Sequence, residues 1–111
     1  MAYTEKALID GTFLTESAVT LYTCTAPVTK TIVKEITFCN TGSIAYTFTL
    51  YIVPLGQTAA DRYARFKTVT IQPNETKIFG LSTVLEVGSF ISALASTTSV
   101  VAISASGVER T

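Results

Sequence analysis

Apolar and polar residues alternate with a period of two along most of the chain, in short runs separated by turn residues. The clearest run follows a turn signal at residues 40–43. Its even positions from Ile44 to Ile52 are all apolar, whereas Thr47 and Thr49 lie on the other face. A helix would scatter these apolar positions around its circumference, and Pro54 ends the run. The pattern therefore predicts a β-strand with one face toward a core.

Similar runs predict the other strands, at 7–14 with a kink at Asp10-Gly11, and at 18–23, 31–40, 66–71, 76–81, 84–95 (bent at Gly88) and 100–109. In the run 31–40 the even positions Ile32, Ile36 and Phe38 are expected on the core face, with Lys34 either near a strand end or extending its ammonium group to solvent. We expect two hairpins: 18–25 with 31–40, and 66–71 with 76–81 through a type I turn at 72–75. Residues 58–64 have helical character, with Thr58 as a capping residue.

The composition supports a β protein, because 39 of the 111 residues are Val, Ile or Thr. Hydrophobic residues make up 48% of the chain and charged residues 14%, which argues against disorder. Seven to nine short strands with frequent turns predict an antiparallel β-sandwich, jelly-roll or immunoglobulin-like. We expect one domain, 1–111, with residues 1–6 as a flexible N-terminal arm.

Eight basic and eight acidic residues give a formal net charge of zero. No basic stripe follows the chain, so we expect no nucleic-acid partner. No apolar run is long enough for a membrane helix, and the first residues lack the apolar core of a secretory signal, so we expect no membrane partner.

The sequence offers little for catalysis. It has no His, its glycines are isolated, and its eight acids are scattered. We predict that the protein is not an enzyme and has no catalytic residues, cofactor or metal site. Cys24 and Cys39 are expected as free thiols, because the first hairpin would hold them apart and nothing indicates secretion.

Aromatic and basic residues near 56–65 are the candidate partner contacts. Tyr63 lies in this segment with Arg62 and Arg65, and loops at the ends of sandwiches commonly carry recognition. Tyr22 and Tyr51 are weaker candidates, on faces shared with Thr. Outer faces rich in Thr and poor in charge can pack against an identical neighbour, which favours a symmetric oligomer.

A resemblance to a known group of proteins rests on four segments: LYTCTAPVTKTIVKEITFCNTGSIAYTFTLYIVPLG, TVTIQPNETKIF, VLEVGSFISALAS and VAISASGVE. The chain from about Leu21 to Glu109 resembles a group of small virion proteins of tailed bacteriophages. Residues 26–41 are similar to the first motif of that group, and residues 47–56 are similar to the strand that follows this motif. The turn 71–76 and the bend 85–93 also match, with Ser89 and Phe90 in place of the usual Asp and its neighbour.

The resemblance implies a non-enzymatic β-sandwich of the virion, acting as a capsid decoration (cement) or head-fibre protein. It implies a homotrimer that contacts the major capsid protein or another virion protein, after synthesis in the host cytoplasm. No site residues carry over. The alternative is a tail-associated receptor- or carbohydrate-binding module, in which Arg62, Tyr63 and Arg65 would be the contacts.

Overall fold

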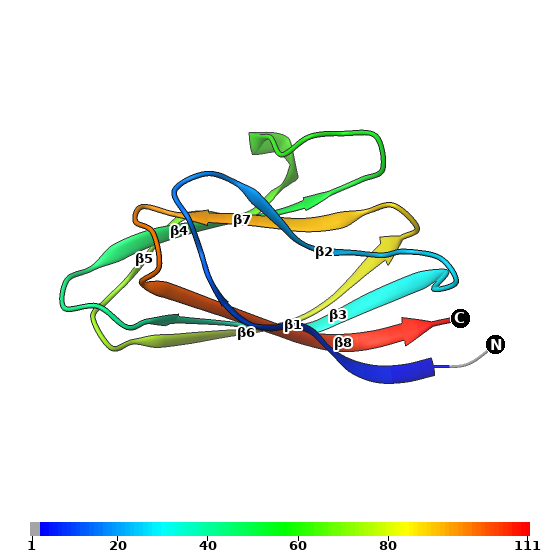
Figure 1. Ribbon diagram of the computed structural model, residues 1–111, viewed down its shortest axis with the longest axis horizontal. Helices are drawn as coiled ribbons and strands as arrows, with labels where there is room; N and C mark the ends of the chain where they lie inside the picture. Colours follow the sequence, from blue (N-terminus) through cyan, green and yellow to red (C-terminus); the bar gives the residue numbers. More distant parts are fainter. Residues whose placement is uncertain (1–2) are drawn as a thin grey trace.

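The computed structural model describes residues 3–111, whose strands form two four-stranded antiparallel sheets packed face to face (Figure 1). The β1 sheet has the strand order β1-β8-β3-β6, and the β2 sheet has the order β2-β7-β4-β5. In chain order the elements are β1 (Tyr3–Phe13), β2 (Val19–Thr23), β3 (Lys30–Asn40), β4 (Tyr46–Val53), the 3-10 helix η1 (Asp61–Tyr63), β5 (Ala64–Ile71), β6 (Thr76–Glu86), β7 (Phe90–Ala95) and β8 (Val101–Arg110). The predicted antiparallel sandwich is confirmed.

The connections distinguish between the two predicted architectures. Only β4 and β5 are consecutive strands of one sheet; every other connection crosses from one sheet to the other. Eight strands distributed in this way form a jelly roll. An immunoglobulin-like sandwich instead keeps several consecutive strands paired within one sheet. The jelly-roll alternative is therefore the correct one.

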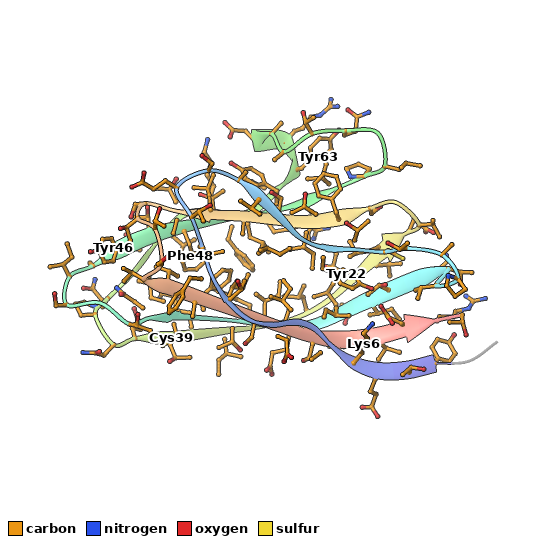
Figure 2. The ribbon with its side chains drawn as sticks, viewed as in Figure 1. Lys6, Tyr22, Cys39, Tyr46, Phe48 and Tyr63 are labelled. Carbon is orange, nitrogen blue, oxygen red and sulfur yellow. The ribbon has the colours of Figure 1, made fainter. Side chains whose placement is uncertain are left out.

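The core lies between the two inner faces and is built around aromatic rings. Phe38 of β3 stacks on Phe48 of β4 with ring centroids 3.8 Å apart, and both side chains are fully buried. Phe79 of β6 approaches both rings edge-on. Figure 2 shows Phe48 inside the sandwich. Of the core face predicted for this strand, Phe48 and Leu50 are fully buried as expected. Ile44 is instead 58% exposed before β4 begins, and at the far end Val53, of the opposite face, is fully buried.

The predicted core face of β3 is right at one end and wrong at the other. Ile36 and Phe38 are fully buried, but before them it is Val33, not Ile32, that is fully buried. The ladder with β6 shifts register between Val33 and Glu35. Such an irregularity moves the strand's inward phase by one residue. Lys34 lies at this shift and is exposed, which explains how a lysine fits into an apolar run.

Both predicted hairpins are wrong. β2 pairs with β7 and β3 pairs with β6 and β8, so the turn at Pro27 crosses between sheets. β5 pairs with β4, and the turn at 72–75 crosses to β6. Turn residues specify a local reversal of the chain, and a reversal serves a crossover as well as a hairpin. The turn itself forms, with Glu75 N donating to Gln72 O, but Asn74 has φ 59°, as in a type II turn rather than type I.

Three local predictions concern the N-terminal arm, the kink in β1 and the helical segment. The expected free arm is wrong for Tyr3–Lys6, because these residues pair with β8; residues 1–2 lie outside the described part. The predicted kink in β1 is present, where the register shifts and Gly11 has φ 81°. The helical segment is a single 3-10 turn preceded by Ala60 with no side-chain cap, so the Thr58 cap is wrong. In the described chain no helix has the length and apolar character to cross a membrane.

Candidate interaction surfaces

The segment between β4 and β5 projects from the outer side of the β2 sheet and carries two of the three predicted contact residues (Figure 1). The Arg62 guanidinium lies 4.8 Å from the centroid of the Tyr63 ring, and its Nη2 donates to the Tyr63 hydroxyl at 2.6 Å. The same nitrogen lies 3.5 Å from Gln57 Oε1. Figure 2 shows Tyr63 in this projecting segment, away from the core. The exposed Arg62 and the half-buried Tyr63 thus form one cation–π unit on this segment.

An ion pair connects the end of this segment, at η1, to the neighbouring strand β5. Lys67 Nζ of β5 lies 2.7 Å from Asp61 Oδ2 of η1, and both side chains are exposed. The hydrogen bond from Lys67 to Asp61 raises the pKa of Lys67 above its ordinary value. The pair ties η1 to the neighbouring strand and leaves Arg62 free of carboxylate partners among the described residues.

Arg65, the third predicted contact, lies elsewhere. It is exposed on β5 and lines a hollow of about 280 Å³ between the edge strands β5 and β6. The hollow is also lined by Phe66 and Phe79, whose rings stack with centroids 4.2 Å apart, and by Leu81 and Thr83. The open flank of the sandwich is therefore apolar, with one cation on it.

Tyr22 shares a strand face with Thr20 in the sequence pattern, which predicted an exposed residue, but in the structure it is half-buried. The β2–β7 ladder shifts register between Thr20 and Tyr22, and Tyr22 packs against the core. Its hydroxyl donates to Glu109 Oε2 of β8 at 2.5 Å and lies 2.8 Å from Thr31 Oγ1 of β3. Because the tyrosine proton goes to the carboxylate, the Thr31 hydroxyl is the donor in the second bond.

These bonds join the two sheets near the chain ends, where Figure 2 shows Tyr22 and Lys6. Lys6 Nζ lies 3.3 Å from the other oxygen of Glu109, whose side chain is only 12% exposed. Burial, followed by the hydrogen bond to Glu109, raises the pKa of Tyr22 well above its ordinary value of 10.0. The cluster of Tyr22, Thr31, Glu109 and Lys6 is a cross-sheet polar contact, for which a structural role is sufficient.

The outer face of the β1 sheet carries exposed charges on its inner strand β3, at Lys34 and Glu35, and exposed apolar side chains on its two edge strands. Tyr3 and Phe13 of β1, and Ile78 and Val84 of β6, are 61%, 48%, 62% and 49% exposed. These residues lie on the two edge strands of the sheet. Between them, a hollow of about 270 Å³ over β1, β8 and β3 is lined by Asp10 and Glu35 with small residues.

The remaining side chains to consider are possible metal ligands, the two cysteines and Tyr51. Among residues 3–111 no cluster of three or more His, Cys, Asp or Glu is placed to hold a metal ion. Cys24 is buried and Cys39 half-buried, and both are free. Tyr51, the remaining candidate, is half-buried on β4.

The sequence analysis did not identify the edge strand β6 as a candidate interaction surface. A feature that indicates one is present in the sequence, since the run from Ile78 to Leu85 contains no charge and no proline. That run becomes significant only when the strand order places it at an edge.

Comparison with known proteins finds solved structures with a similar fold but does not assign the chain to a family. No family model and no curated protein matches the chain. A chain in the T13 viral particle of IBDV has a TM-score of 0.62 at 9% identity, over 97% of this chain and 30% of that chain. A chain of the infectious bursal disease virus Gx strain has a TM-score of 0.54 at 14% identity, with the same coverages. This chain spans 30% of the length of either neighbour, and the likeness is one of fold.

Proposed function

We propose that the protein is a non-enzymatic structural component of a virus particle, in which it acts as a symmetric oligomer. The observation that carries the proposal is the jelly roll itself, shared over 97% of the chain with chains of a virus particle. A fold alone does not assign a function. The exposed apolar side chains on the edge strands of the β1 sheet add support, because a neighbouring subunit that covers them removes apolar surface from water.

The more specific form of the proposal is a capsid decoration (cement) or head-fibre protein of a tailed bacteriophage. It rests on the resemblance between about Leu21 and Glu109, whose segments correspond to strands and to the turns that join them. The partners would be further copies, as a homotrimer, and the major capsid protein or another virion protein. The protein would be located in the virion after synthesis in the host cytoplasm.

The test combines solution mass with copy counting. Light scattering on a sizing column is expected to give an oligomer, near three times 11.9 kDa for a trimer or a multiple of it. Quantitative mass spectrometry of purified particles of the encoding virus is expected to find the protein in many copies, at a fixed ratio to the main shell protein. Absence from the particles would contradict the proposal whatever the mass in solution.

A second candidate is favoured by the Arg62–Tyr63 unit. A half-buried aromatic ring beside an exposed guanidinium, on a projecting segment, is suited to contact a receptor or a carbohydrate. This is the tail-associated binding module. A glycan array with the protein and its Tyr63→Ala and Tyr63→Phe variants tests it. Binding that only Tyr63→Ala abolishes would support this function, and an array without binding would contradict its carbohydrate form.

A further inference from the structure

β6 is an edge strand whose free side lacks the usual protection. It is the last strand of the β1 sheet, and between Lys77 and Glu86 it has neither a charge nor a proline. In the described chain, residues 77–85 make no backbone hydrogen bond beyond the ladder with β3. Exposed edges of this kind pair with other strands unless something blocks them.

The other three edge strands are blocked. β1 has two register shifts and carries Lys6 and Asp10. β2 has only five residues and one register shift. β5 has two register shifts, a positive φ at Thr68 and the charges of Arg65 and Lys67. Bulges, short length and charge are the devices that proteins use to prevent edge pairing. β6 has one such device, a register shift against β3 between Gly80 and Thr83, and it keeps its alternation of side chains through that shift, so it is the least protected of the four edges.

The side chains of β6 suit an added strand. Ile78 and Val84 point outward and are 62% and 49% exposed, with Gly80 and Ser82 between them on the same face. On the other face Phe79 and Leu81 line the hollow between β5 and β6. A strand placed along β6 would therefore cover apolar side chains on both of its faces.

We propose that β6 pairs in antiparallel fashion with β6 of a second copy of this chain, about a two-fold axis at Leu81. In this register Ile78 lies opposite Val84 of the partner subunit, and Gly80 lies opposite Ser82 of the partner subunit. Directly opposed β-branched side chains stabilise a sheet. The pair is made twice by the symmetry, and the two β1 sheets become one eight-stranded sheet.

A second copy fits this edge better than an unrelated strand because β6 is complementary to itself. Its two exposed aliphatic residues lie three positions on either side of Leu81, so a two-fold axis there brings each onto the other. The charges of Lys77 and Glu86 stay at the ends of the pairing, where water solvates them. β6 itself brings no charge to the centre of the pairing, where the nearest cation is Arg65 of β5, at the hollow that Leu81 lines.

This contact deepens the proposed symmetric oligomer and rests on that part of the proposed function, but not on its location in a virion. The two-fold contact joins single chains into dimers. Where another surface forms trimers, it joins two trimers. In both cases loss of the β6 contact halves the mass in solution.

Crosslinking tests the register directly. The variant Ile78→Cys/Val84→Cys, in a Cys39→Ser background, is expected to give a covalent dimer under oxidising conditions. Within one chain these positions are six residues apart on a strand, about 20 Å, which is too far for a disulfide. Either single-cysteine variant is the control and should stay uncrosslinked, because its two copies lie equally far apart. A folded double variant that does not crosslink, or singles that crosslink as well, would overturn the proposal.

A charge on the edge tests the contact without crosslinking. Ser82→Lys is expected to halve the mass seen by light scattering, whereas Thr20→Lys, at an exposed position of β2, should leave it unchanged. Circular dichroism checks that both variants are folded. A wild-type protein that stays monomeric at high micromolar concentration would overturn the inference. Absence from virus particles, with crosslinking intact, would contradict the virion assignment alone.

Discussion

The Tyr22 hydroxyl is one of the few polar groups that connect the two sheets. It bonds Glu109 and Thr31, both on the β1 sheet, while its own strand belongs to the β2 sheet. Glu109 is held in turn by Lys6. Because the Glu109 side chain is nearly buried, losing the tyrosine hydroxyl leaves that carboxylate with fewer donors in a position that water reaches poorly.

Tyr22→Phe is expected to lower the free energy of unfolding by about 1–2 kcal/mol at neutral pH. The folded-state pKa of Tyr22 lies above the unfolded value of 10.0, so its contribution is complete below that pH and is lost as the pH rises beyond it. Urea denaturation from neutral pH to above 10.0 measures both effects. The alkaline loss of stability should be smaller in Tyr22→Phe, and an equal loss in the two proteins would contradict this assignment.

The side chain of Asn40, at the end of β3, bonds backbone groups of the turn that follows it. Its Nδ2 donates to Ile44 O at 2.9 Å and to Ile71 O at 3.0 Å, and its Oδ1 accepts from Gly42 N at 2.8 Å. The residue is fully buried. The amide therefore serves three backbone groups, of which the Ile71 carbonyl is bonded in the buried interior, and this requires both its donors and its acceptor.

Asn40→Ala is expected to lower the free energy of unfolding by about 2–4 kcal/mol, because three backbone groups lose their partner. Asn40→Asp should also destabilise, since a carboxylate accepts from Gly42 but cannot donate to the two carbonyls. Ser43→Ala, an exposed change in the same turn, is the control and should be nearly neutral. Chemical denaturation compares the three variants. An Asn40→Asp variant as stable as wild type would show that the donors are not needed.

At the scale of elements, local pattern predicted where strands lie but not which strands pair. The alternation around Phe48 located β4, since a half-buried strand must alternate. The phase of β3 changes at Lys34, where its ladders with β6 and β8 both shift register, and both partners lie more than forty residues away. The two crossovers have the same turn residues as hairpins, because turn chemistry is local and sheet membership is not.

The candidate surfaces divide in the same way. Arg62 and Tyr63 are neighbours in sequence, so their association could be predicted, whereas Arg65 points to another flank because β5 begins between them. Tyr22 turned inward because β2 shifts register against β7. The exposed edge of β6 depends on the order of all four strands in its sheet, so no local pattern could have identified it.

Pairing of Tyr3–Lys6 with β8 makes the first residues part of the fold. Deletion of residues 1–6 removes four ladder positions and the Lys6–Glu109 ion pair. We expect it to lower the free energy of unfolding by about 1–3 kcal/mol. Lys6→Met, which removes only the ion pair, should cost less than about 1 kcal/mol. Denaturation curves compare the two, and an unchanged stability on deletion would restore the free arm.

On the scale of the whole molecule, the chain forms its sheets from segments distant in sequence. β1 at one end pairs with β8 at the other, with Tyr3 opposite Arg110. The β1 sheet is therefore complete only when nearly the whole described chain has folded. This topology leaves β1 and β6 as the edges of one sheet, and of these only β6 has a long uncharged stretch. The surface available for association is thus a consequence of the jelly roll.

The charge balance of the molecule predicts how its association responds to salt. With eight basic and eight acidic residues, two copies have no net charge to repel each other. The proposed contact around Leu81 contains no ion pair, so added sodium chloride has nothing to screen there. We expect light scattering to give the same mass at low and high sodium chloride, and sulfate to favour the associated state by strengthening apolar burial. Dissociation on adding sodium chloride would instead indicate a contact made by exposed charges such as Lys30 and Glu86.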